Sequence, residues 1–278
     1  MSIWYYCERT SDSLDEELAD VETCIYCGSG LQRDRYDESI FLNYCYLWYY
    51  EFCVAPDINA VVGVCPACGW WKCGFSIVEY RGTHTSDGCE KRLRMKAGSL
   101  RRLDLSNSEL PLEQVRDYLT ARFEARFEVH PRVFEDVVAS VFRDQGYEAR
   151  VTAYSNDGGI DVILEYGKES TIGVQVKRYK EKITVAQIRE LTGALVIGGH
   201  AKGIFVTTSE FQSGAFSTAA ASAYRGFPIE LVDAPRFFEE LKIAQLSGTR
   251  ELFDKKPWGE IPSWPDLSSH PDALNPRR

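Results

Sequence analysis

The segment from residue 157 to residue 179 constrains the fold of this chain more than any other. It contains two stretches in which apolar and polar residues alternate. The first opens at Asp161 behind a Gly-Gly turn, and the second carries Gln175 and Lys177 on one side. Alternation with a period of two is typical of β-strands, and side chains two residues apart on a strand point the same way. If the two strands pair, Gln175 and Lys177 face the region that Asp161 faces.

These three side chains define a candidate site. A carboxylate and an amide oxygen, together with the backbone carbonyl of Val176, are ligands suited to a hard divalent cation, and the lysine adds a positive charge beside them. Such a set suits metal-assisted hydrolysis of a phosphodiester. A lysine in the middle of a strand is also costly unless an anion pairs with it. The alternative is a strand-end aspartate beside a solvated strand face.

Glu135 is a further candidate metal ligand. It follows Phe134 on a predicted helix and lies at the edge of the apolar stripe rather than opposite it. A side chain at that position can reach inward, towards the other candidate ligands. A capping or solvated glutamate in the first turn of the helix is the alternative.

Helix and strand signals alternate along residues 131–246. An apolar helical stripe begins at Phe134 and ends before Gly146. Thr184 and Gln187 have the spacing of a capping box that opens another helix. The other predicted elements are strands over 148–154, 159–165, 171–179, 203–208 and 229–232, and helices over 213–224 and 235–246. This order predicts an α/β fold whose sheet is partly parallel.

All nine cysteines lie in the first 89 residues, and this segregation predicts a metal-binding segment rather than disulfides. Two Cys-x2-Cys pairs are each followed by glycine and are separated by 37 residues. Four thiolates in two such turns predict one tetrahedral structural zinc site, with a hairpin inserted between the pairs. The predicted ligands are Cys24, Cys27, Cys65 and Cys68. The residues that could replace one of them are Cys7, Cys73, Cys89 and His84.

The rest of the N-terminal part gives a coarser picture. The aromatic run 41–54 predicts a strand that is apolar on both faces, where Cys45 and Cys53 fit as buried thiols. Residues 91–108 are basic and then polar, which indicates a linker. An amphipathic helix with Pro111 near its start is predicted next. The predicted domains are a zinc-ribbon-like domain with an inserted aromatic hairpin (1–100), a linker and amphipathic helix (101–130), the α/β domain (131–246) and an irregular tail (247–278).

The net charge of −9 is unusual for a protein that binds nucleic acid, and residues 1–100 contribute −6 of it, with nine basic and fifteen acidic residues. DNA contact would therefore need local basic patches. The sequence contains two, namely Lys91, Arg92, Arg94, Lys96, Arg101 and Arg102, and then Lys177, Arg178, Lys180 and Lys182. No apolar run has membrane-spanning length and the N-terminus has no signal-peptide pattern, so the expected location is the cytoplasm.

Residues 131–245 resemble the Mrr-like restriction endonuclease domain, a branch of the PD-(D/E)xK nuclease superfamily. The motifs that carry the resemblance are, in order, FEDVVASVFRDQGY, SNDGGIDV, VQVKRY, IRELTGAL, GIFVTTSEF and ELVD. It implies a restriction-endonuclease-like mixed sheet flanked by helices, and Mg²⁺-dependent cleavage of DNA. It makes Asp161 the motif aspartate, Gln175 the residue at the D/E position, Lys177 the motif lysine and Glu135 the helix-borne glutamate. Glutamine in place of glutamate removes a negative charge from the metal site.

The expected function is that of a metal-dependent DNA endonuclease serving restriction or anti-phage defence, with Mg²⁺ as catalytic and Zn²⁺ as structural cofactor. The expected DNA contacts are Arg178, Tyr179 and Lys180, and Lys91, Arg92 and Arg94 on a basic arm. The alternative is a catalytically weak DNA-binding or scaffold protein whose zinc domain recruits a protein partner. DNA is the expected partner, and proteins of a defence system and a second copy of the chain are further candidates.

Overall fold

The computed structural model describes residues 3–9, 21–36, 57–80, 89–153, 158–165 and 170–248. The chain divides into two compact units, here called unit 1, within residues 1–102, and unit 2, from Leu103 to Thr249. The predicted aromatic strand 41–54 and the predicted tail beyond residue 248 lie outside the described residues. None of the helices in the described ranges has the length and hydrophobicity that crossing a membrane requires.

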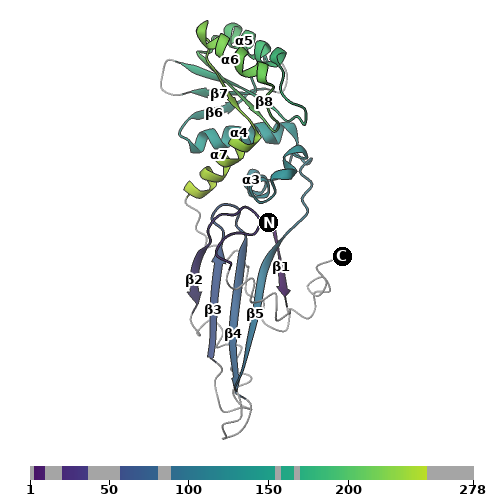
Figure 1. The fold of residues 1–278 in the computed structure, drawn as a ribbon, viewed down its shortest axis with the longest axis vertical. Coiled ribbons are helices and arrows are strands. Elements are labelled where there is room, and N and C mark those ends of the chain that lie inside the picture. Colours follow the sequence, from purple (N-terminus) through teal and green to yellow (C-terminus); the bar gives the residue numbers. More distant parts are fainter. Residues whose placement is uncertain are drawn as a thin grey trace. The chain divides into compact units, whose positions relative to one another are not determined.

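Unit 2 is an α/β fold built on a mixed five-stranded sheet (Figure 1). Its strands are β6 (Glu148–Val151), β7 (Val162–Glu165), β8 (Thr171–Lys177), β9 (Lys202–Thr207) and β10 (Ile229–Val232). Their spatial order is β10-β9-β8-β7-β6. Strands β10, β9 and β8 run parallel to one another, whereas β7 is antiparallel to both β8 and β6. The predicted mixed sheet is confirmed.

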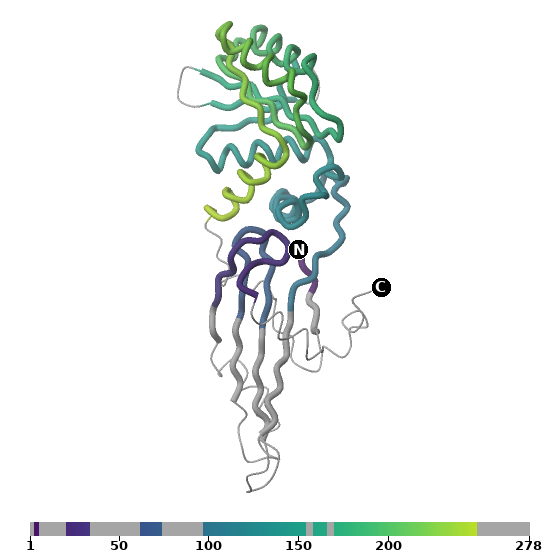
Figure 2. Tube along the Cα trace, viewed as in Figure 1, coloured from purple at the N-terminus to yellow at the C-terminus, as the bar shows by residue number. Residues whose placement is uncertain are grey.

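Helices cover both faces of this sheet (Figures 1 and 2). They are α3 (Leu112–Ala121), the 3-10 helix η2 (Phe123–Phe127), α4 (Pro131–Asp144), α5 (Val185–Gly198), α6 (Ser213–Tyr224) and α7 (Ala234–Ser247). On one face α4 contacts β6, β7 and β8, and the Phe134 ring of α4 meets the Phe237 ring of α7 edge-on at 5.4 Å. On the other face α5 and α6 pack against each other, with α5 contacting β9 and α6 contacting β10.

The sequence signals at the helix ends act as expected. Gly146, with φ of +92°, turns the chain after α4, and Gly199, with φ of +69°, ends α5 in the left-handed conformation. The capping box is present at the start of α5, where the Thr184 N–H donates to Oε1 of Gln187 at 2.9 Å. These local contacts fix the residues at which α4 and α5 end and α5 begins.

Unit 1 contains a five-stranded antiparallel sheet. Its strands are β1 (Trp4–Arg9), β2 (Gln32–Tyr36), β3 (Asp57–Val64), β4 (Trp71–Tyr80) and β5 (Cys89–Leu100), in the order β1-β5-β4-β3-β2. The prediction that residues 91–100 begin a linker is wrong, because they form β5 and pair with both β4 and β1. The physical reason is a period-two pattern in which Leu93, Met95 and Ala97 alternate with charged residues.

Candidate active site and candidate metal centre

Asp161 lies immediately before β7, where pairing with β8 begins. Its backbone N–H donates to the Val174 carbonyl at 2.9 Å, and its Oδ2 accepts a 2.6 Å hydrogen bond from the Val176 N–H. The side chain is only 8% exposed. Gly158 and Gly159, both with positive φ, form the turn that leads into β7. The carboxylate is therefore held against the peptide between residues 175 and 176 of β8.

Gln175 presents a buried side-chain oxygen that no described residue hydrogen-bonds. Its side chain is 4% exposed, and Oε1 forms no hydrogen bond with any described residue. Such an atom is costly to bury, and it calls for a ligand that supplies positive charge or a proton. The amide group lies beside the turn before Asp161, since a Cβ built on Gly159 would stand 3.9 Å from Nε2 of Gln175.

The backbone of Val176 adds a third oxygen. The Val174 carbonyl and the Val176 N–H both point to the β7 side of β8, whereas the Lys177 carbonyl points to β9, where it accepts from the Thr208 N–H at 3.1 Å. The N–H and C=O of one strand residue point to the same side. The Val176 carbonyl is therefore directed towards Asp161. A carboxylate, an amide oxygen and a carbonyl form a donor set that fits Mg²⁺ or a similar hard cation.

Lys177 is the last residue of β8 and is half-buried. It lies two residues after Gln175, so the two side chains share a face of the strand. Its carbonyl also accepts from the Thr207 hydroxyl at 3.0 Å, which fixes the main chain that carries the ammonium group. The structure thus brings the predicted lysine to the same strand end as the oxygen ligands.

Glu135 lies on α4, next to the buried Phe134, with its side chain 17% exposed. Arg132 donates to its Oε2 at 2.8 Å. Burial raises the pKa of the Glu135 carboxyl, the hydrogen bond from Arg132 opposes this, and the charge of Asp161 raises the pKa further. The charge of Asp161 thus disfavours ionisation of Glu135, and a nearby cation would favour it.

The three residues after Lys177 differ in the solvent exposure of their side chains. Arg178 is half-buried and donates from Nη1 to the Phe127 carbonyl, and its Nε forms no hydrogen bond with any described residue. Tyr179 is 44% exposed, and Lys180 is exposed with its ammonium 5.9 Å from the centre of the Phe127 ring. The predicted DNA contacts at these positions are therefore available at two of the three side chains.

The predicted basic arm of unit 1 has a different geometry. Lys91, Arg92 and Arg94 all lie on β5, and their side chains are outside the described part of the structure. Contact of these three residues with DNA stays a prediction.

The four predicted zinc ligands converge in unit 1. Each Cys-x2-Cys pair lies in a tight turn that ends at a glycine with positive φ, Gly28 at +72° and Gly69 at +75°. In each turn the glycine N–H donates to the carbonyl of the first cysteine at 2.9 Å. All four sulfurs lie within 4.8 Å of one another, and the two cross-turn pairs are 3.5 and 3.4 Å apart. A tetrahedral Zn–thiolate site has sulfurs about 3.8 Å apart, so the cluster fits zinc.

The four thiols shift one another's pKa. Hydrogen bonding with Cys24 lowers the pKa of Cys27 and of Cys65, and it raises the pKa of the deeply buried Cys68. Hydrogen bonding with Cys27 in turn raises the pKa of Cys24. Four thiolates cannot coexist at this spacing unless a divalent ion neutralises them. Cys73 is buried outside the cluster, while the side chains of Cys7 and Cys89, and all of His84, lie outside the described residues.

Comparison with known families places the candidate catalytic residues in a single domain. Residues 127–241 match the Mrr_cat family model, which is described as Restriction endonuclease. This segment is similar to restriction endonucleases of the Mrr family. It contains Glu135, Asp161, Gln175 and Lys177, whereas the cysteine cluster lies outside it.

Two curated relatives match parts of this chain. The Escherichia coli K12 protein named Type IV methyl-directed restriction enzyme EcoKMrr is 30% identical over 110 residues, which is 37% of this chain and 36% of the relative. Uncharacterized protein y4cE of Sinorhizobium fredii is 36% identical over 90 residues, or 31% of this chain and 23% of the relative. The chain thus spans about a third or less of these relatives. A solved structure of the restriction endonuclease FokI aligns with 66% of this chain and 37% of its own at 13% identity, with a TM-score of 0.35.

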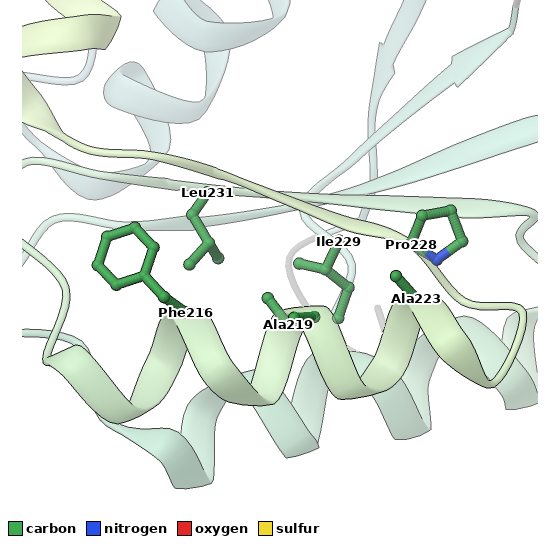
Figure 3. Close-up of a pocket in the computed structure, with 7 residues that line it drawn as sticks. Phe216, Ala219, Ala223, Pro228, Ile229 and Leu231 are labelled. Atoms are coloured by element: carbon green, nitrogen blue, oxygen red, sulfur yellow. The ribbon is translucent and has the colours of Figure 1, made fainter.

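An apolar groove of unit 2 is lined by none of the candidate catalytic residues. It runs between α6 and β10 (Figure 3). Its lining consists of Phe216, Ala219, Ala220, Ala223, Pro228, Ile229 and Leu231. None of these side chains can bind a cation or move a proton, so the groove carries no part of the proposed chemistry.

Several contacts that hold this site have no signal in the sequence. The hydroxyls of Thr208 and Ser209 donate to the carbonyls of Tyr179 and Lys180. Arg126 of η2 donates to the Thr208 carbonyl. The motif GIFVTTSEF contains the two hydroxyl residues, but nothing in their spacing indicates a partner about thirty positions away.

Proposed function

We propose that this protein is a metal-dependent endonuclease that hydrolyses phosphodiester bonds of DNA and serves in restriction or anti-phage defence. The observation that carries the proposal is the buried, unpartnered Oε1 of Gln175 beside the peptide that holds Asp161. In a domain of a restriction endonuclease family, an oxygen-lined position of this kind is best explained as a catalytic cation site.

In the proposed mechanism, Asp161, Gln175 Oε1 and the Val176 carbonyl would hold Mg²⁺, and Glu135 would add negative charge nearby. When bound, the ion would supply Lewis acidity to a phosphate oxygen and lower the pKa of a water molecule. The Lys177 ammonium orients the attacking water and stabilises the negative charge that develops on the phosphate. Water adds to phosphorus and gives one proton to solvent as the bond to the leaving oxygen breaks, and that oxygen takes a proton from solvent.

Cleavage of supercoiled plasmid tests this proposal. Purified protein should nick or linearise plasmid in the presence of Mg²⁺ and stop when EDTA is added. Asp161→Ala and Lys177→Ala should each lower the rate by at least about a hundredfold, because each removes charge from the reacting centre. Binding of DNA without metal should change little. Plasmid from methylating and non-methylating hosts should be compared, since one relative carries a methyl-directed name.

Lys202→Ala is the matched control, because Lys202 begins β9 at the opposite end of the sheet and pairs with Glu230 at 2.9 Å. It should cleave at the wild-type rate. Cleavage at that rate by Asp161→Ala or Lys177→Ala would refute the catalytic assignment. A wild-type protein that binds DNA tightly and never cleaves it would favour a scaffold role instead.

We also propose that Cys24, Cys27, Cys65 and Cys68 bind one structural Zn²⁺. The support is the convergence of their four sulfurs on two glycine-terminated turns. In this proposal unit 1 serves as a module that directs the nuclease to DNA or to a protein partner, and the zinc ion stabilises its fold.

A further inference from the structure

The segment after β8, here defined as residues 178–180, is held by side chains rather than by strand pairing. Regular pairing of β8 with β9 ends at Lys177 and Thr207. Beyond that point the Thr208 hydroxyl donates to the Tyr179 carbonyl at 2.9 Å, and the Ser209 hydroxyl donates to the Lys180 carbonyl at 3.0 Å. With the bond from Thr207 to the Lys177 carbonyl, three consecutive buried hydroxyls fix three carbonyls of one short stretch.

A second set of contacts ties this segment to η2. Arg178 donates to the Phe127 carbonyl at the end of η2. Arg126 donates from Nε to the Thr208 carbonyl at 3.2 Å, and its guanidinium lies 3.8 Å from the centre of the Phe123 ring and 4.1 Å from that of Phe127. Both arginines are thus committed to backbone oxygens of the protein.

We infer that Arg178 is a positioning residue rather than a DNA contact, and that it acts with the Thr208 hydroxyl to present Tyr179 and Lys180 to the DNA backbone next to the scissile phosphate. The inference rests on the proposed nuclease function. Its basis is the contrast within three residues: Arg178 is half-buried with its guanidinium on a carbonyl, whereas Tyr179 and Lys180 are exposed on a fixed main chain.

The salt dependence of DNA binding distinguishes a residue that contacts phosphate from one that only positions its neighbours, because a phosphate contact releases counterions. Each phosphate contact made to duplex DNA by a lysine or arginine contributes about 0.9 to the slope of log K against log salt. A residue that contacts phosphate therefore lowers the slope when it is removed. A residue that only positions its neighbours leaves the slope nearly unchanged and instead lowers the rate of cleavage of bound DNA, because a misplaced group loses its alignment.

The experiment measures both quantities on the full-length protein. Binding of a fluorescent duplex is titrated at several salt concentrations in EDTA, and single-turnover cleavage is measured with Mg²⁺ at saturating DNA. For Lys180→Ala the slope should fall by about 0.9. For Arg178→Ala the slope should change by less than about 0.3. The cleavage rate of Arg178→Ala should fall by at least about tenfold. Lys202→Ala should leave both quantities unchanged.

A pair of substitutions at Thr208 guards against misfolding of the arginine variant. Thr208→Val keeps the shape and removes the hydroxyl, so it should slow cleavage without changing the salt slope, whereas Thr208→Ser should restore the rate. Hydrogen exchange of the amides of residues 178–182, measured without DNA, should be faster in Arg178→Ala and Thr208→Val than in Thr208→Ser.

A slope for Arg178→Ala that falls as far as that of Lys180→Ala would overturn the inference and make Arg178 a phosphate contact. Unchanged cleavage and unchanged exchange in both Arg178→Ala and Thr208→Val would also overturn it. If the wild-type protein does not cleave DNA, the proposed function fails, yet the salt slopes and the exchange rates still decide between the two roles of Arg178.

Discussion

Gln175 places a neutral amide where a carboxylate would bind a cation more strongly. Its unpartnered Oε1 costs stability in the absence of a ligand. Gln175→Leu removes that oxygen, so the free energy of unfolding in EDTA should stay the same or rise by about 1 kcal/mol. The variant should gain no stability from Mg²⁺ and should not cleave DNA. Urea unfolding with and without Mg²⁺ measures both effects.

Gln212→Leu is a suitable control for this substitution, because Gln212 is exposed and outside the site. A Gln175→Leu protein that is stabilised by Mg²⁺ as much as the wild type would remove Gln175 from the ligand set.

Glu135 should make stability depend on pH in a defined direction. Its pKa is raised in the folded state, chiefly by burial, so the folded protein keeps a proton that the unfolded chain has already lost. Without metal, the stability that the protonated form contributes is present below the unfolded pKa and is lost as pH rises through the folded pKa. Glu135→Gln should flatten this decline, as measured by urea unfolding across acidic pH in EDTA.

Added Mg²⁺ should shift the Glu135 titration to lower pH, because a nearby cation favours the ionised carboxyl. Carbon-detected NMR of the carboxyl group reads this midpoint directly. An unshifted midpoint at saturating Mg²⁺ would mean that Glu135 lies apart from the metal.

The roles of single residues were partly predictable. Asp161, Gln175 and Lys177 stand out in the sequence because period-two alternation along a strand fixes the directions of its side chains. The buried, unpartnered oxygen of Gln175 was not predictable, since it depends on what surrounds a side chain rather than on its position along the strand. The hydroxyl of Thr208 was missed for a similar reason, as its acceptor lies 29 residues earlier.

At the scale of elements, the start of α5 tests how much a helix cap visible in the sequence stabilises the fold. The first turn of α5 is closed by a capping box, in which the Thr184 hydroxyl also donates to Oε1 of Gln187 at 3.1 Å. Thr184→Ala should lower the free energy of unfolding of unit 2 by about 1 kcal/mol, while Thr184→Ser should lose much less. Denaturant titration followed by far-UV circular dichroism measures the difference. Equal stability of the alanine and wild-type proteins would show that the cap is not stabilising.

The two sheets differ in how well the sequence predicted them. In unit 2 each strand follows or precedes a helix with clear end signals, so the predicted elements agree with the structure within about two or three residues at most ends. In unit 1, the sequence predicted a linker at β5 because its basic side chains outweigh the smaller apolar residues between them. The alternation of Leu93, Met95 and Ala97 was the signal available there. The order of the five strands was not predictable, because it depends on pairing between distant segments.

At the scale of the whole molecule, zinc and stability should be linked in unit 1 alone. The two cysteine turns are far apart in sequence, so a metal ion that joins them closes a long loop. Elemental analysis should find about one zinc per chain, and Cys65→Ser should lower that content and unfold unit 1. A strong chelator should act similarly, while unit 2, which is compact by itself, remains folded.

In a calorimeter, the protein in chelator should show only the transition of unit 2, whereas the zinc-loaded protein should also show a transition of unit 1. A fragment that begins at Leu103 should fold without zinc, whereas one that begins inside β5 would carry an unpaired strand. A wild-type protein that is folded throughout and contains no metal would contradict the zinc assignment.

The confinement of every cysteine to the first 89 residues gives the two units unequal chemical vulnerability. Hydrogen peroxide, hypochlorous acid and electrophiles attack thiolates, and oxidation of zinc-bound thiolates releases the ion. The unit that carries Asp161 and Lys177 has no thiol to lose. On the proposed function, a burst of oxidant would therefore disable target recognition by unit 1 and leave the proposed hydrolytic residues intact. Oxidative stress would then remove target selection and keep the capacity to cleave.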